Sequence, residues 1–168
     1  LPLTPYIEQV VHLGTPSTKP AEWPAPPLPG LVDCPMGETP GIYAMPDGAR
    51  GYKVGLDRPL RSLAGGTLGD DLDREAVSER TETIRARVAR DLTAVEPHVL
   101  ATQVCTWTDS GDGDFVIGRV HPGVVLACGD SGEGFKYAAF MGQYLADLVE
   151  GGAGDPEFQR HWNPERFR

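Results

Sequence analysis

The fold of this chain is decided by one stretch, which runs Val124-Val125-Leu126-Ala127-Cys128-Gly129-Asp130-Ser131-Gly132-Glu133-Gly134-Phe135-Lys136. Its first five residues form an apolar run of strand length that ends at a glycine, which predicts a buried strand followed by a turn. Beyond the turn, apolar residues at i, i+3, i+4 and i+7 predict a helix that ends at Gly151-Gly152, namely Met141, Tyr144, Leu145 and Leu148.

A strand, a glycine turn and a helix start present backbone N–H groups to an anion. Lys136 would add a positive charge one residue into the helix, and three glycines leave room for a bulky planar or phosphorylated ligand: Gly129, Gly132 and Gly134. Two phosphate-binding motifs do not fit, because the lysine is one position late for a P-loop and Tyr137 replaces the third glycine of the dinucleotide fingerprint. A strand-to-helix connection in which the glycines merely permit a tight turn explains the pattern equally well.

The length and charge of the chain exclude several classes of protein. Its 168 residues suffice for one domain, or for parts of two. A net charge of -9 argues against nucleic acid or an anionic membrane as a partner, and no apolar run approaches the roughly 20 residues of a membrane span. A start without methionine or a signal-peptide pattern suggests a piece of a longer protein. Three cysteines without metal-binding spacing predict a reduced, cytoplasmic setting and no metal site.

The upstream half is expected to contain strands. Residues 6–13 read as one strand, and residues 41–45 and 51–55 read as a hairpin that places Lys53 in mid-strand among apolar neighbours. Such a lysine usually reaches solvent, and one held on an inner face must be paired or used. The proline-rich residues 14–40 cannot form a central strand. They are expected to be a surface connection, although their PxxP pattern formally offers sites for an SH3-like partner.

A helix is predicted over Asp70–Asp91, with acidic residues at its start, basic residues at its end and a solvated charged face. Its apolar side is expected to comprise Leu72, Ala76, Ile84 and Val88. A strand follows over Val99–Trp107, with Gln103, Cys105 and Trp107 on one face. The acidic run Asp109–Asp114 fails the EF-hand template and is expected to be a hairpin turn. The aromatic and basic tail from Asp155 to Arg168 is expected to pack across the domain.

Several of these stretches together resemble one family. Cys105-Thr106-Trp107-Thr108, Asp112-x-Asp114-Phe115, His121-Pro122 and the run from Ala127 to Lys136 are similar to the C-terminal half of monomeric sarcosine oxidase and of the related N-methyltryptophan, pipecolate and fructosyl-amine oxidases. Tyr6–Val11 and Gly51-Tyr52-Lys53-Val54-Gly55 resemble segments farther upstream in that family.

The resemblance implies an FAD-dependent amine oxidase that acts with dioxygen and releases peroxide. It implies an α+β fold: a largely antiparallel sheet of a substrate domain with a long surface helix, and a C-terminal strand, glycine turn and helix. The last three would complete an FAD-binding domain whose N-terminal Rossmann part is missing from this sequence. The expected boundaries are 1–104 for the substrate domain, 105–150 for the flavin-contacting portion and 151–168 for the tail. The implied partners are a small amine and the missing half, in the same protein or in a separate subunit.

The resemblance also implies roles for particular residues. Cys105 matches the cysteine that holds the flavin covalently, and Lys53 the lysine that promotes the reaction with oxygen. Lys136 matches the lysine that pairs with the substrate carboxylate, and Trp107 stands where an active-site tyrosine lies. The residues expected against the flavin are Cys105, Gly129, Ser131, Gly132, Glu133, Gly134, Phe135 and Lys136.

Two departures from the family concern charge. Asp57, four residues after Lys53, and Glu133, inside the glycine turn, replace histidines. Acids at these positions make sarcosine itself doubtful as the substrate and favour a bulkier or more cationic amine. Two other readings stay open: a non-catalytic subunit that shapes a pocket or binds a partner, and a flavin dehydrogenase that does not use oxygen.

Overall fold

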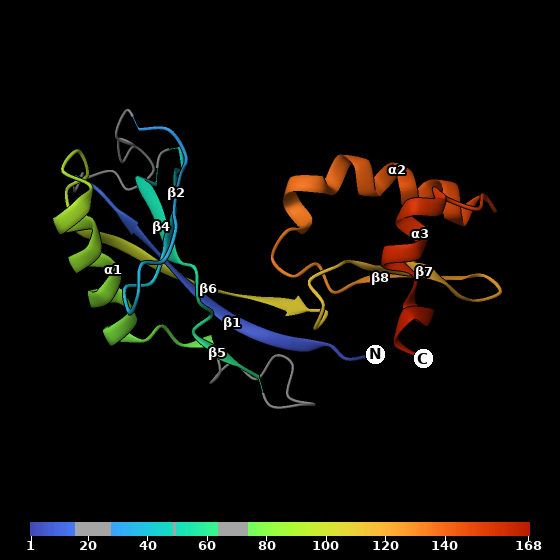
Figure 1. Cartoon of the computed structure of the whole chain (residues 1–168). Helices are drawn as coiled ribbons and strands as arrows, with labels where there is room; N and C mark the ends of the chain where they lie inside the picture. Colours follow the sequence, from blue (N-terminus) through green and yellow to red (C-terminus); the bar gives the residue numbers. More distant parts are fainter. Residues whose placement is uncertain (16–27, 49, 64–73) are drawn as a thin grey trace. The chain divides into compact units, whose positions relative to one another are not determined.

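The computed structural model describes residues 1–15, 28–48, 50–63 and 74–168 of the chain (Figure 1). The chain divides into two compact units. The sheet unit consists of Ile7–Ser62 and Gly69–Cys105, and the hairpin unit of Leu1–Tyr6, Leu63–Leu68 and Thr106–Arg168. Together they mix helices with antiparallel sheets, as the sequence predicts.

The sheet is built from strands that follow one another mostly by short connections. Its order is β2-β3-β4-β1-β5, and β6 also pairs with β1; β2/β3, β3/β4 and β4/β1 are antiparallel. The bounds are β1 Thr4–Leu13, β2 Leu31–Asp33, β3 Ile42–Pro46, β4 Tyr52–Leu56, β5 Arg61–Ser62 and β6 Val99–Asp109. The four predicted strands are thus confirmed. The described end of the proline-rich stretch contributes only β2, at the edge of the sheet, where a strand poor in N–H donors is tolerated.

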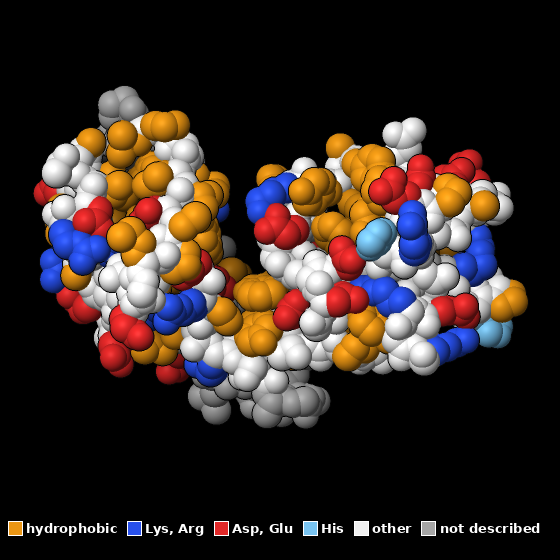
Figure 2. Space-filling model, viewed as in Figure 1, with side chains coloured by type: hydrophobic (Ala, Val, Ile, Leu, Met, Phe, Trp, Pro, Cys, Tyr) orange, Lys and Arg blue, Asp and Glu red, His pale blue; other side chains and the backbone are white. Residues whose placement is uncertain are grey.

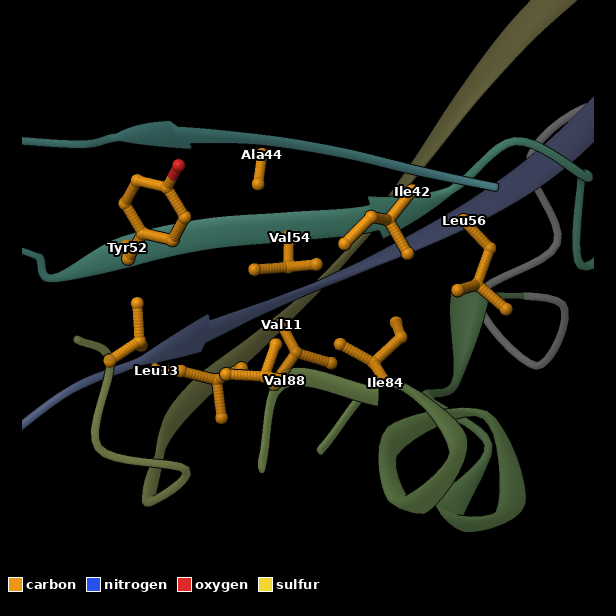
Figure 3. Close-up of a cluster of buried hydrophobic side chains, with 10 residues drawn as sticks. Val11, Leu13, Ile42, Ala44, Tyr52, Val54, Leu56, Ile84 and Val88 are labelled. Atoms are coloured by element: carbon orange, nitrogen blue, oxygen red, sulfur yellow. The ribbon is translucent and has the colours of Figure 1, made fainter. Parts of the chain in front are cut away.

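Helix α1 (Ser78–Asp91) covers one face of this sheet (Figures 1 and 3). Alternate residues of each strand point toward it because side chains alternate between faces. The buried cluster comprises Val11, Leu13, Ile42, Ala44, Tyr52, Val54, Leu56, Ile84, Val88 and Val95. Each large aliphatic side chain buried in this way contributes about 1.5–3 kcal/mol. Ile84 and Val88 therefore hold the helix on the sheet, as predicted.

The start of α1 differs from the prediction. Residues 70–73 lie outside the described residues, and Glu75–Val77 are not helical, so Ala76 is exposed and not on the apolar side of the helix. The cause is the buried amide of Gln9, whose Oε1 accepts a hydrogen bond from the Val77 N–H at 2.7 Å and whose Nε2 donates to the Val77 carbonyl at 3.2 Å. These bonds occupy the main chain of Val77 in an extended conformation, so the helix begins only after it.

The charged face of α1 is also less solvated than predicted. Arg87 contacts the carboxylate of Asp33 and the carbonyl of Pro40, and its side chain is only 11% exposed. Arg80, equally buried, donates to Glu8 Oε1 at 2.9 Å. These two arginines bind α1 to the loops and to β1, so the prediction of a solvated face is wrong for them.

The hairpin unit is formed by β7 (Val116–His121) and β8 (Val124–Cys128), which α2 (Ala138–Val149) and α3 (Pro156–Trp162) cover (Figure 1). Two short 3-10 turns, η3 (Gly134–Tyr137) and η4 (Pro164–Phe167), precede α2 and follow α3. The core comprises Ile117, Met141, Tyr144, Leu148 and Trp162, which confirms the predicted stripe of α2. The tail packs on this core through Trp162 and Phe158, whose rings stack with centroids 4.4 Å apart.

Strand β8 is less buried than predicted. It pairs with β7 in a two-stranded sheet, and Val124 and Ala127 are exposed, while Val125 and Leu126 are half-buried. Hydrophobic side chains also reach the surface over α2 (Figure 2), among them Phe140 and Val149. No helix among the described residues is both long enough and apolar enough to cross a bilayer.

Replacing Arg80 by methionine tests the buried ion pair. The Glu8 carboxylate would stay buried without its cation, so we expect the free energy of unfolding at pH 8 to fall by about 3–5 kcal/mol. Burial already raises the pKa of Glu8 above 4.5, and removing Arg80 raises it further. Between pH 4.5 and this raised pKa, the Glu8 carboxyl group is protonated in the folded variant but ionised in the unfolded one. Lowering the pH through this range therefore favours the folded variant, so its loss of stability becomes smaller.

Urea denaturation at pH 8 and pH 5.5 measures this effect. Arg85→Met is the matched control, because Arg85 pairs with Glu82 on the exposed side of the same helix and should matter little at either pH. Equal losses in the two variants, or a loss in Arg80→Met that does not depend on pH, would contradict the role of the pair.

Candidate functional site

The first candidate site lies on the face of the sheet opposite α1. Lys53 on β4 is the register partner of His12 on β1 and of Met45 on β3. Lys53 is half-buried between them, while its neighbours Tyr52 and Val54 point to the core. Lys53 is thus held at mid-sheet, with neighbours on both sides, as the sequence predicts.

Tyr43 crosses this face beside Lys53. Its register partner is Gly55, and a Cβ at Gly55 would overlap the Tyr43 ring. Burial raises the pKa of the Tyr43 hydroxyl, and the negative charge of Glu8 and the nearby Cys105 thiol raise it further. The phenol is therefore a neutral donor at physiological pH. Sequence reasoning missed Tyr43, although a glycine inside a strand pattern is a signal for a close approach at this point.

Cys105 lies on β6, where its side chain is exposed. Partial burial raises the pKa of its thiol, and the Glu8 carboxylate adds to that effect, whereas the Lys53 ammonium lowers the pKa. Cys105, Glu8 and Lys53 therefore lie close enough to interact, although they come from β6, β1 and β4. Asp57 lies just beyond β4, exposed, and its charge acts on Glu8.

His12 is a further member of this face that sequence reasoning missed. It is 2% exposed, and its Nδ1, which makes no hydrogen bond to the described residues, lies 3.5 Å from Asp47 Oδ2. Burial lowers the pKa of the imidazole, with smaller contributions from Arg50 and Lys53, against the opposing effects of Asp47 and Gln103. A neutral imidazole thus lies beside the Lys53 ammonium.

The second candidate site is the glycine turn of the hairpin unit. Two of its glycines make room for the protein itself: a Cβ at Gly129 would lie 2.9 Å from Val116 Cγ2, and one at Gly134 would lie 2.8 Å from Asp130 Oδ2. Gly132 is the open one, because its nearest neighbour would be the Trp107 ring at 3.9 Å. At Gly129 and Gly134 the absence of a Cβ thus accommodates the protein's own side chains, whereas at Gly132 it leaves open space.

Around the open glycine lie other residues that the sequence singles out. Trp107 packs against Tyr6 with ring centroids 4.9 Å apart. Phe135 is 96% exposed, an unusual position for a phenylalanine ring, and the Lys136 ammonium pairs with the Glu133 carboxylate. Lys136 lies in η3, which leads directly into α2 at Ala138, so the helix start predicted at Lys136 is present as a 3-10 turn.

The predicted site residues thus fall into two groups. Lys53 and Cys105 come together on the sheet unit, with Glu8, Tyr43 and His12 as neighbours. Trp107 and the turn residues Gly129, Ser131, Gly132, Glu133, Gly134, Phe135 and Lys136 belong to the hairpin unit.

Comparison with known proteins defines the class. The family model described as FAD dependent oxidoreductase (DAO) matches residues 1–148, so the chain belongs to this family of flavoproteins.

Within the family, its curated relatives are amine oxidases. Monomeric sarcosine oxidase of Streptomyces avermitilis is 30% identical over 83 residues, which are 48% of this chain and 22% of the relative. N-methyl-L-tryptophan oxidase of Citrobacter koseri is 39% identical over 49 residues, 28% of this chain and 13% of the relative. The matched regions therefore span less than a quarter of each relative.

The fold agrees with solved structures of similar enzymes. Fructosamine oxidase from Aspergillus fumigatus matches with a TM-score of 0.62 at 22% identity, covering 96% of this chain and 39% of that one. Iminodiacetate oxidase from Chelativorans matches with a TM-score of 0.62 at 23% identity, covering 97% and 41%. The chain thus has the fold of about two fifths of such an oxidase.

The residues present fit the cofactor of this family. On the sheet unit, the Cys105 thiol is exposed and the Lys53 ammonium acts on it. On the hairpin unit, the turn contains the accessible Gly132 and the exposed ring of Phe135. Taken separately, a thiolate can form a covalent bond to a cofactor, and an exposed aromatic ring can stack on a planar one.

The charges around Cys105 predict its reactivity. In a Cys34→Ser, Cys128→Ser background, Lys53→Met should raise the pKa of the Cys105 thiol and slow its alkylation by iodoacetamide at pH 8 by about threefold or more. Glu8→Gln should act in the opposite direction. Mass spectrometry of the alkylated peptide measures both rates, and far-UV circular dichroism checks folding. Identical rates in the two variants would show that Lys53 and Glu8 do not act on the thiol.

Proposed function

We propose that this chain is part of an FAD-dependent amine oxidase that oxidises a C–N bond of an N-alkyl or amino-acid-type amine, with dioxygen as acceptor and peroxide as product. The names of its relatives support this substrate class, since sarcosine, N-methyltryptophan and iminodiacetate each carry a secondary amine and a carboxylate. The observation that carries the proposal is the gathering of the Cys105 thiol and the Lys53 ammonium on one face of the sheet.

In this proposal bound FAD would supply the acceptor for the hydride that leaves the carbon next to the amine nitrogen. Cys105 holds the cofactor through its sulfur, and the turn formed by Gly129, Ser131, Gly132, Glu133, Gly134 and Phe135 lies against it. The Lys53 ammonium stabilises the negative charge that develops on oxygen as it is reduced, which is often the largest single catalytic effect in such sites. Burial lowers the pKa of His12, so the imidazole beside Lys53 is neutral and does not repel its ammonium group.

Substrate binding is assigned to the remaining site residues. Lys136 binds the substrate carboxylate in exchange for its present partner Glu133. Trp107 forms a wall of the pocket beside the open Gly132. Asp57 and Glu133 add negative charge, which favours a bulkier or more cationic amine than sarcosine. No side chain is assigned as a general base, because a neutral amine gives up a hydride without one.

The proposal includes the domain organisation. Residues 1–104 form part of the substrate domain, 105–150 contact the flavin and 151–168 form the tail. The nucleotide-binding Rossmann half comes from the same protein or from a separate subunit. The three free cysteines support a location in the reducing cytoplasm.

A second candidate function is a non-catalytic one. In this alternative the chain shapes a substrate pocket and does not perform the redox step alone. Peroxide formation by the assembled protein separates this candidate from the oxidase, and from a flavin dehydrogenase that does not use oxygen.

The attachment of FAD is tested by mass. We expect the chain, co-expressed with an N-terminal flavin-domain partner and then denatured, to gain the mass of FAD on the peptide that contains Cys105. Cys105→Ala should lose this gain, whereas Cys34→Ser should keep it, because Cys34 is exposed but lies at the edge strand β2. Absence of bound flavin in the assembled protein would refute the proposal.

Lys53 is tested by separating the two half-reactions. Lys53→Met should slow reoxidation of the reduced protein by dioxygen by roughly 100-fold or more, with a much smaller effect on reduction by the amine. Lys136→Met should instead raise the KM for a carboxylate-bearing amine. Stopped-flow absorbance measures both half-reactions, and an unchanged oxygen rate in Lys53→Met would remove this lysine from the mechanism.

A further inference from the structure

We infer that Arg166, in the C-terminal tail, is a positioning residue for the glycine turn, which it holds through Asp112, Ser110 and Ser131. The inference rests on the proposed role of that turn against the flavin. All four residues belong to the hairpin unit. In this inference the tail positions the glycine turn in addition to packing on the core.

Ser131 is the strained residue at the centre of the turn. Its φ of 48° lies in the left-handed region, and it is the only described residue other than glycine with a positive φ. A side chain in this conformation persists only where the surrounding structure enforces it, and such residues cluster at ligand-binding sites. The turn therefore depends on the contacts that hold Ser131.

Those contacts come from the end of β6 and the residue that follows it. The Ser131 N–H donates to the Thr108 carbonyl at 2.9 Å, and its Oγ donates to Asp109 Oδ1 at 3.0 Å. The Ser110 N–H donates to Ser131 Oγ at 3.3 Å, and the two hydroxyl oxygens lie 3.3 Å apart. Ser131 is thus fixed on several sides, and Ser110, which is fully buried, is the innermost of its partners.

Ser110 is held in turn by Asp112. The Ser110 hydroxyl donates to Asp112 Oδ1 at 3.0 Å, and both oxygens of that carboxylate accept from Arg166, at 2.8 Å from Nε and 2.9 Å from Nη2. Arg166 also donates to the Asp114 carbonyl at 3.1 Å. A bidentate guanidinium–carboxylate pair fixes direction as well as distance, so Arg166 orients the carboxylate toward Ser110.

The tail is itself anchored. Trp162 is buried in the core of the hairpin unit, and a Cβ at Gly118 would lie 2.6 Å from Pro164 Cδ, so Pro164 lies directly on β7. The Asn163 side chain caps the short turn that carries Arg166. The chain of contacts therefore runs from a rigid core, through Arg166, to the strained turn.

Hydrogen exchange of the 168-residue chain tests this chain of contacts directly. Arg166→Met should speed exchange of the amides in residues 129–134 by about tenfold or more, while the amides of α2 keep their protection. Asp112→Asn should act in the same way, and the double variant should add little, because both substitutions break one connection. Arg166→Lys should restore part of the protection, since lysine offers a single point charge to the carboxylate.

Arg168→Met is the matched control, because Arg168 forms an exposed tail pair with Glu165 that has no path to the turn. The inference is overturned if exchange in 129–134 is unchanged in Arg166→Met, or if α2 loses protection equally, which would show only general loosening.

FAD affinity, measured in the assembled protein with Cys105→Ala so that the proposed covalent bond cannot form, separates this inference from the proposed function. Weaker FAD binding in Arg166→Met but not in Arg168→Met supports both. Faster exchange with unchanged FAD affinity would keep the mechanical link from Arg166 to Ser131 and refute the assignment of the turn to the flavin.

Discussion

The pairing of β1 with β4 is the constraint on which the sheet unit depends. Its register sends Val11, Leu13 and Val54 toward α1 and places His12 opposite Lys53 on the other face. A slip by one residue would exchange these two sets, moving a lysine and a histidine into the core. The burial of aliphatic side chains under α1 therefore also determines where the Lys53 ammonium lies, and one register fixes both stability and the candidate site.

The buried Glu8 carboxylate links the face that carries His12 and Lys53 to helix α1. Glu8 points to the same side as His12, yet it is buried and paired with Arg80 of α1, and its negative charge acts on both Tyr43 and Cys105. Burial raises the pKa of both the thiol and the phenol, the Glu8 carboxylate raises each further, and Lys53 lowers the pKa of the thiol. The pKa of the Cys105 thiol is thus raised first by burial and then adjusted by two opposing charges on neighbouring strands.

In the hairpin unit, hydrogen bonds hold the candidate site in its conformation. The turn holds one non-glycine residue in a left-handed conformation, and the contacts that enforce it lead from Ser131 through Ser110 and Asp112 to Arg166. Two of the three glycines serve close packing within the protein, and only Gly132 faces open space beside Trp107. The spacing of the three glycines, which suggests a ligand site in the sequence, therefore reflects packing within the protein as much as access for a ligand.

The sequence by itself determined the order of strands and helices and the buried stripe of α2, because hydrophobic periodicity is a local property. Its resemblance to the amine oxidase family singled out Lys53 and Cys105. It did not reveal Glu8, His12, Tyr43 or Arg166 as members of a site, and it placed the start of α1 too early because the buried Gln9 amide competes for Val77. These features depend on residues that are far apart in the chain, such as Asp112 and Arg166, whose residue numbers differ by 54. Only tertiary structure sets them, since strand register and ion pairing bring distant residues together in ways that no local pattern records.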